Sequence, residues 1–323
     1  MSTRSADTVQ AWTGHWAQTL TGSIDLNGAD PVAHALRRHW ANRVSQLRAC
    51  GQIVDVGSGP AILARLMGSL GWAVEHPNTW WCVDQADLGQ GWQQSLPTGV
   101  RVLDGLPFEQ SRPPSGPVDA MVSNFGLEYL DRAGLVNTLP HWLGPHAHLE
   151  AVLHARGSVI DKVSAEHAAD LRVALHELEL PQRGLDLVQA LATAPTDPVH
   201  RMMHGVEVRD AYNAAVDQLK QRMEARGRPS AVLMDLLGGI THALRGVRST
   251  GAEGASQAIS RLGRSLEAEW ARLQQMQACA LDERQLSEWH SALQGTMAQP
   301  QRLKAQRIDC ALGLVAWNLS TAA

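Results

Sequence analysis

A short glycine turn follows the first buried apolar run of the sequence. Gly57 and Gly59 flank Ser58 directly after Gln52 to Val56, and a helical pattern begins behind them. Glycine allows the backbone to approach a ligand closely, and the first turn of a helix presents free N–H groups. The turn therefore predicts a small-molecule site, although a glycine pair alone identifies no ligand.

Polar side chains stand where the following apolar runs end. Asp84, Asp104 and Asn124 follow three of these runs, and His154 closes a fourth. A carboxylate accepts hydrogen bonds from hydroxyl groups more strongly than a neutral side chain does. A histidine can take a proton from an amine or hydroxyl group near neutral pH. His154 is thus either a general base or an ordinary polar residue at a strand end.

The elements that position these residues alternate between strand and helix. Helical patterns separate most of the apolar runs, which indicates right-handed crossovers and a mostly parallel sheet covered on both faces. Ligands bind such sheets at the carboxyl ends of the strands, where the polar residues stand. The expected strands cover residues 52–57, 80–83, 100–103, 118–123 and 147–154, and a helix is expected over 127–143.

The rest of the chain changes in character. Residues 161–293 are rich in Ala, Leu and Gln with helical periodicity, and strand patterning resumes over 302–308 and 312–320. The sequence therefore predicts a Rossmann-like α/β fold with a large all-helical insertion before the last two strands. Four segments are expected: an N-terminal helical segment or lid (1–50), the ligand-binding core (51–160), the insertion as a substrate roof (161–293) and the final strands (294–323).

Composition excludes several classes of function. The 323 residues carry 28 basic and 32 acidic side chains with no basic run, which argues against nucleic acid as a partner. The four cysteines lie far apart, and no histidine cluster has ligand spacing, so no metal site is expected. The sequence shows no signal core and no apolar run long enough to span a membrane. The expected location is the cytoplasm.

Tryptophan is unusually frequent among the aromatic residues. The chain has 11 Trp but only two Phe and two Tyr. An indole ring attracts cations through its electron-rich face, with about 0.5–2 kcal/mol per contact. Some of these rings are therefore candidates for a cation site, while ordinary core packing explains most of them.

Several motifs together resemble class I S-adenosylmethionine (SAM)-dependent methyltransferases. The glycine turn resembles the first motif of that family, and Ile62 stands where a dinucleotide-binding turn carries a third glycine. The resemblance implies that Asp84 holds the ribose hydroxyls and that the segment from Asp104 to Leu106 contacts adenine. Residues 119–129 resemble the fourth motif. The cofactor-binding residues implied are Asp55, Gly57, Ser58, Gly59, Asp84, Gln85, Asp104, Gly105, Leu106, Asn124 and Phe125.

The same resemblance suggests roles near the reacting group. Asn124 and His154 are the expected catalytic residues. Trp12 and Trp16, four residues apart, are expected on an N-terminal lid that excludes water. Glu128 either contacts the acceptor or, at the start of a helix, favours the positive end of that helix, and Tyr129 is expected to contact the acceptor.

The expected function is methyl transfer from SAM to a small, partly apolar molecule. One alternative keeps the fold but uses the γ-carbon of SAM, in aminocarboxypropyl transfer or in closure to azetidine-2-carboxylate with release of methylthioadenosine. Another is a SAM- or metabolite-binding module without chemistry. Neither the acceptor nor the oligomeric state follows from the sequence.

Overall fold

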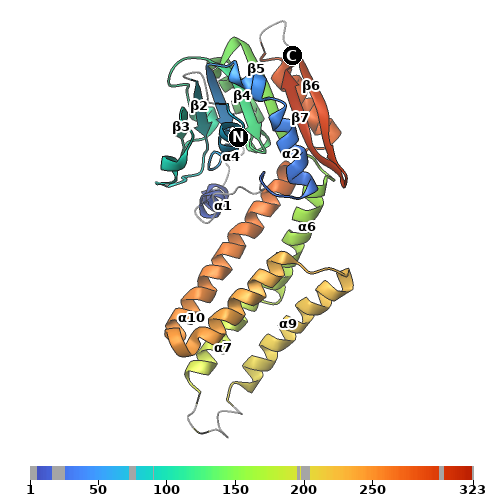
Figure 1. Cartoon of the computed structure of the whole chain (residues 1–323). Coiled ribbons are helices and arrows are strands. Elements are labelled where there is room, and N and C mark those ends of the chain that lie inside the picture. Colours follow the sequence, from blue (N-terminus) through green and yellow to red (C-terminus); the bar gives the residue numbers. More distant parts are fainter. Residues whose placement is uncertain are drawn as a thin grey trace. The chain divides into compact units, whose positions relative to one another are not determined.

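The computed structural model describes residues 6–16, 26–72, 78–89, 91–194, 197, 204–297 and 302–321. The chain forms two compact units (Figure 1). The core unit comprises Met1–Val163 and Gln275–Ala323, and the helical unit comprises Ser164–Gln274.

The core unit is built on one seven-stranded sheet. Its strand order is β3-β2-β1-β4-β5-β7-β6, in which β1 to β5 are parallel and β7 is antiparallel to both neighbours. The first five positions repeat the order of doubly wound nucleotide-binding sheets. The expected Rossmann-like α/β fold is confirmed. The strands are β1 (Gln52–Val56), β2 (Thr79–Val83), β3 (Val100–Leu103), β4 (Val118–Asn124), β5 (Leu143–His154), β6 (Leu303–Cys310) and β7 (Gly313–Thr321).

Helices cover the sheet, and their ends follow local capping rules. α2 begins at Pro31, and the Asp30 carboxylate accepts the N–H groups of Val32 and Ala33 at 2.9 and 3.0 Å. These contacts satisfy N–H groups that have no partner inside the helix. The other helical elements of the core unit are α1 (Ala6–Trp16), α3 (Val44–Arg48), α4 (Ile62–Ser69), α5 (Arg132–Trp142), α11 (Glu283–Gln294) and the 3₁₀ turns η1 (Trp92–Ser95), η2 (Phe108–Gln110) and η3 (Leu127–Tyr129).

The helix expected over 127–143 is interrupted. η3 is followed by a new helix, α5, because the Asp131 carboxylate accepts the N–H of Gly134 at 2.8 Å and caps a second start. The chain then enters β5 at Leu143, earlier than the sequence pattern indicated.

The large insertion between β5 and β6 is helical wherever the structure describes regular elements, as expected. Its elements are α6 (Val159–Arg172), the π-helical turn η4 (Val173–Glu177), α7 (Leu180–Ala192), α9 (Val206–Arg226) and α10 (Ala231–Cys279). A non-helical Gly251 (φ 74°) divides α10 into two helical segments.

The helical unit is shorter than the predicted segment 161–293. α11 belongs to the core unit, where Leu286, Trp289 and Leu293 are buried in the hydrophobic cluster of the sheet. The role of the insertion as a substrate roof stays a prediction.

A buried ion cluster ties helices of this unit together. Asp170 is fully buried on α6 and accepts two hydrogen bonds from Arg226, at 2.6 and 2.8 Å, and one from Arg222 at 3.0 Å. Burial opposes ionisation of Asp170, but these guanidinium contacts lower its pKa to about 2. Because every oxygen is paired, we interpret the cluster as structural.

The described part of the chain has neither a membrane-spanning helix nor a metal-binding cluster. None of its helices is long and apolar enough to cross a bilayer. No three of its His, Cys, Asp or Glu side chains are grouped so that they could hold a metal ion.

Candidate ligand site at the switch point of the sheet

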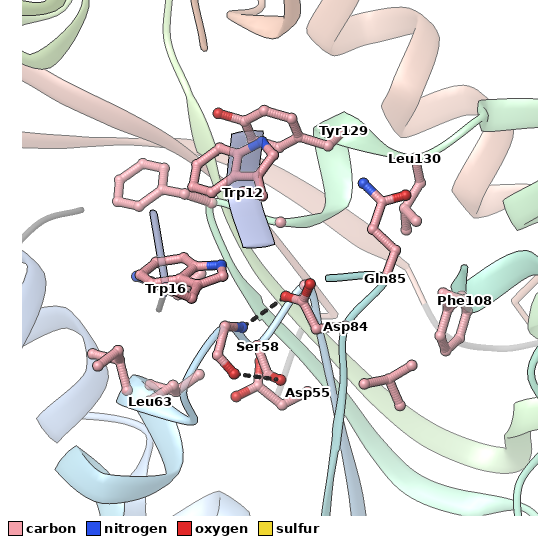
Figure 2. A pocket seen from close by; sticks show the side chains of 17 residues that line it. Trp12, Trp16, Asp55, Ser58, Leu63, Asp84, Gln85, Phe108, Tyr129 and Leu130 are labelled. Carbon is pink, nitrogen blue, oxygen red and sulfur yellow. Dashed lines mark hydrogen bonds between the residues drawn. The ribbon is translucent and has the colours of Figure 1, made fainter. Parts of the chain in front are cut away.

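A cavity opens where the direction of strand order reverses between β1 and β4. Doubly wound sheets bind ligands at this point, because the connections from the two strands diverge and leave a crevice. The space is about 880 Å³, part of which is open to solvent (Figure 2). Its lining comes from α1 and from the carboxyl ends of β1, β2 and β4, and consists of Trp12, Trp16, Asp55, Gly57, Ser58, Gly59, Ile62, Leu63, Val83, Asp84, Gln85, Phe108, Asn124, Phe125, Gly126, Tyr129 and Leu130.

The glycine turn forms one wall of the cavity. Gly57 and Gly59 have φ values of 66° and 50°, a region that disfavours other residues. The turn leads into α4, whose N-cap residue Ala61 makes no side-chain cap. The first N–H groups of α4 are therefore not satisfied by a capping side chain, and the adjoining Ile62 lines the cavity.

Asp84 follows β2 and braces the glycine turn. One carboxylate oxygen accepts the N–H of Gly59 at 2.8 Å, and the other accepts the N–H of Ala86 at 2.8 Å. Burial raises the pKa of Asp84, while these two N–H groups lower it and nearby Asp104 raises it. A carboxylate has about four lone-pair positions, so both oxygens keep capacity for ligand hydroxyl groups.

Asp55 lies on β1 beneath the same turn. Its side chain is almost fully buried, and Oδ2 accepts a 3.4 Å hydrogen bond from the indole of Trp80. Oδ1 is buried and has no hydrogen-bond partner among the described residues. Burial raises the pKa of Asp55 to about 8, the Trp80 bond opposes the rise, and the charge of Asp84 adds to it. Asp55 is thus an acidic group with an unused oxygen in the cavity wall.

The N-terminal helix α1 contributes two indole rings. The Trp16 ring lies against Gly59 so closely that a Cβ there would sit 2.9 Å from Trp16 Cζ2. Trp12 stacks on Trp16 with ring centres 5.6 Å apart and meets Tyr129 edge-on at 5.5 Å (Figure 2). These rings place an aromatic surface opposite the acidic side chains.

Two polar contacts also hold α1 in this position. Trp12 Nε1 donates to Gln275 Oε1 at 2.8 Å, and the N–H of Asp87 donates to the Thr13 hydroxyl at 3.2 Å. Asp87 belongs to the loop that follows Asp84. α1 is therefore held by α10 and by the loop that follows β2, an arrangement that suits the lid expected from the sequence.

Asn124 ends β4, and its orientation is fixed from outside the cavity. Trp40 on α2 is fully buried and donates its indole N–H to Asn124 Oδ1 at 2.8 Å. Phe125 follows with a φ of 59°, which a residue with a side chain rarely adopts. Its ring lines the cavity on one side and stacks on His154 on the other, with ring centres 4.4 Å apart.

His154 and Glu128 do not line the cavity. His154 is 4% exposed and lies behind Phe125. Glu128 is buried, and its Oε1 accepts the backbone N–H of His154 at 2.7 Å. Burial raises the pKa of Glu128 to about 7, while backbone N–H groups lower it. This geometry gives both residues a supporting place behind the aromatic wall, and their expected direct roles stay predictions.

The predicted adenine-binding segment also lies outside the cavity lining. Asp104 accepts the N–H of Leu88 at 3.3 Å, and the N–H of Gly105 donates to Ala86 at 3.3 Å. Leu106 is 55% exposed. The segment steadies the loop after β2, while Phe108, two residues further along, does reach the cavity.

Sequence reasoning missed several apolar lining residues. Ile62, Leu63, Val83, Gly126 and Leu130 carry no polar signal, although each lies within a few residues of a motif. Trp40 falls in the expected N-terminal helical segment (1–50) and was given no role of its own. Nothing in its local pattern indicates that its indole reaches the end of β4.

The lining of the cavity combines acidic and aromatic side chains. It includes the carboxyl groups of Asp55 and Asp84 and five aromatic side chains, but no Lys, Arg or His among the residues that the structure describes there. Such a site suits a ligand with hydroxyl groups and positive charge. It offers no basic side chain to a diphosphate.

Comparisons with known proteins show a similarity of fold and no more. No family model and no curated protein matches the chain. A SAM-dependent methyltransferase from Leishmania major is 18% identical, with a TM-score of 0.35 over 46% of this chain and 60% of that chain. A geranyl diphosphate methyltransferase is 12% identical, with a TM-score of 0.35 over 46% and 67% of the two chains.

A different class of protein is also similar. A Rhodobacter sphaeroides protein assigned as a zinc-dependent alcohol dehydrogenase is 11% identical, with a TM-score of 0.45 over 99% of this chain and 100% of that chain. This chain spans only 60% of the Leishmania structure. With such low scores and identities, function has to be argued from the site.

Proposed function

We propose that this protein binds SAM in the cavity at the switch point and transfers its methyl group to a small, partly apolar acceptor. The observation that carries the proposal is the charge of the cavity lining. SAM bears a sulfonium and an ammonium against one carboxylate, whereas a dinucleotide carries an anionic diphosphate. No basic side chain stands among the described residues of the lining. Its acids are Asp84 and Asp55, of which Asp55 is largely protonated near neutral pH because burial raises its pKa to about 8, so the lining offers nothing to balance a diphosphate and the cation-rich ligand is the better match.

The glycine turn gives the same preference. In a dinucleotide site, the diphosphate rests on the turn and on the first N–H groups of the following helix. Here the indole of Trp16 packs directly against Gly59. The surface that would receive a diphosphate is thus covered by an apolar ring, while the neighbouring carboxylate of Asp84 stays available to ribose hydroxyls.

The aromatic side chains suit the sulfonium end of SAM. Trp12, Trp16, Phe125 and Tyr129 line the cavity, and a sulfonium has no N–H or O–H to donate to a polar group. Ring faces attract such a cation without acting as nucleophiles. The bound cofactor would supply an electrophilic methyl group. The chain would orient the reactants and exclude water through α1.

A general base is not part of the proposed mechanism. His154 is the residue of suitable chemistry, but it does not line the cavity, whereas its ring neighbours Phe125 and Tyr129 do. Alignment of the acceptor with the methyl group can supply most of the acceleration in a displacement reaction. Leu63, Phe108 and Leu130 also line the cavity, which favours an apolar acceptor.

Binding and reaction can be tested separately. Isothermal titration should show binding of SAM and S-adenosylhomocysteine (SAH) and much weaker binding of NAD⁺. Tighter binding of NAD⁺ would overturn the proposed ligand. Mass spectrometry of SAM incubated with the protein then reports the reaction.

The products distinguish methyl transfer from the alternatives. Formation of SAH only when an acceptor mixture is present supports methyl transfer. Methylthioadenosine from SAM alone would instead indicate reaction at the γ-carbon. Tight SAM binding without either product, across acceptors of varied chemistry, would indicate a binding module.

A further inference from the structure

Trp40 fixes the orientation of the Asn124 side-chain amide. An indole N–H can only donate, so the atom that it contacts at 2.8 Å must be the amide oxygen. The amide nitrogen has no hydrogen-bond partner among the described residues, and Asn124 lines the cavity. The side chain therefore presents two N–H donors to the cavity, and its oxygen already holds one hydrogen bond outside it.

The cavity needs such a neutral donor if the ligand contains an anion. No basic side chain stands among the described residues of its lining, and a charged Asp84 there would repel a carboxylate. A carboxylate must then be held by amide, hydroxyl or backbone N–H groups. Asn124 is the lining amide whose oxygen is fixed by a fully buried partner.

We propose that Trp40 is a positioning residue that locks Asn124 as a hydrogen-bond donor for the carboxylate of the bound ligand. This inference rests on the proposed function, in which that group is the carboxylate of the methionine half of SAM. Trp40 does not line the cavity and acts only through Asn124. Without its N–H, the amide can turn over and present its oxygen to the carboxylate.

The test is a double-mutant cycle with SAH binding measured by isothermal titration. Trp40→Phe keeps an apolar ring and removes the N–H, and it should weaken SAH binding about three- to tenfold. The same change in an Asn124→Ala background should have little further effect, because the residue on which Trp40 acts is gone. Asn124→Asp keeps the acceptor for Trp40 but replaces the donors, and should weaken SAH binding more than tenfold.

A matched control separates positioning from general loss of a buried indole. Trp72 is also fully buried, and its N–H donates to the Leu47 carbonyl at 3.3 Å, away from the cavity. Trp72→Phe should lower the melting temperature much as Trp40→Phe does and leave SAH affinity unchanged. Methylthioadenosine, which lacks the carboxylate, should bind the Trp40→Phe and wild-type proteins equally.

Each other result counts against the proposal. Equal loss of SAH affinity in Trp40→Phe and Trp72→Phe, or unchanged affinity in Asn124→Asp, would overturn the positioning role. Loss of methylthioadenosine binding as large as the loss of SAH binding would overturn the carboxylate assignment. If the wild-type protein binds no SAH, the proposed function itself fails. If the wild-type protein binds SAH but the effects of Trp40→Phe and Asn124→Ala simply add, only the positioning role of Trp40 fails.

Discussion

Gly57 and Gly126 face each other backbone to backbone at the mouth of the crevice. A Cβ on Gly57 would lie 2.6 Å from Gly126 Cα, and a Cβ on Gly126 would lie 2.4 Å from the Val56 carbonyl oxygen. Both distances are far below van der Waals contact. The ends of β1 and β4 can therefore approach each other only because neither residue has a side chain.

Replacing Gly126 with Ala should disturb both stability and ligand binding. Its φ is ordinary, so the effect would come from the clash with β1 and should cost about 1–3 kcal/mol of unfolding free energy. Urea unfolding measures this change. Gly238→Ala is the control, since that exposed helical position has open space around it and should gain up to about 1 kcal/mol. Equal stability of the two variants would contradict the packing argument.

Replacing Asp84 with Ala should weaken SAM binding. The loss of charge-assisted hydrogen bonds to the ribose should cost about 1.5–3 kcal/mol, measured by isothermal titration. Asp84→Asn keeps one acceptor for the backbone N–H groups and should lose less SAM affinity than Asp84→Ala. The matched control is Asp87→Ala, an exposed aspartate on the same loop whose carboxylate accepts the N–H of Gly89. Unchanged affinity in Asp84→Ala would remove this residue from the site.

Replacing Trp16 with Ala should speed the release of bound SAM. The ring covers Gly59 and stacks on Trp12, so its removal opens one side of the cavity. We expect a faster dissociation rate with a smaller effect on association, measured by competition in stopped flow. The dissociation rate of SAM from Trp16→Phe should lie between those of the wild-type and Trp16→Ala proteins. Trp270→Ala removes an indole that packs on His176 in the helical unit and serves as the control. A dissociation rate equal to that of wild type would exclude the lid role.

The stability of the protein should depend on the ionisation of Glu128. Burial raises its pKa from 4.5 to about 7, so the folded state holds this proton more tightly than the unfolded chain. Folding stability is therefore lost as the pH rises from about 4.5 to about 7. Glu128→Gln has no proton to lose and keeps the acceptor for the His154 N–H. Relative to wild type, it should gain roughly 1–3 kcal/mol between pH 5 and pH 8.

Urea unfolding at the two pH values measures this difference. Glu207→Gln, an exposed glutamate on α9, should show no such change with pH. A stability difference between Glu128→Gln and wild type that stays constant with pH would show that Glu128 does not titrate in this range.

Local sequence patterns were sufficient for the sheet and for the residues at its strand ends. The strands expected over 80–83 and 100–103 lie inside β2 and β3, and the glycine turn and Asp84 reach the cavity as placed. The strand predictions succeeded because apolar runs and the glycines and polar residues that end them are properties of a few consecutive residues. In a parallel sheet, moreover, the carboxyl ends of neighbouring strands must lie at one edge.

Only the tertiary structure decided how the side chains meet. The partners Trp40 and Asn124 are 84 positions apart, and Trp12 and Gln275 are 263 apart. His154 ends its strand at the expected edge, but its ring stacks on Phe125, and it is Phe125 rather than His154 that lines the cavity. Leu106 ends up exposed, while Phe108 is buried in the site. The place of a residue at a strand end fixes the edge of the sheet to which it belongs. Its rotamer and its neighbours depend on helices that pack from distant parts of the chain, and no local pattern encodes them.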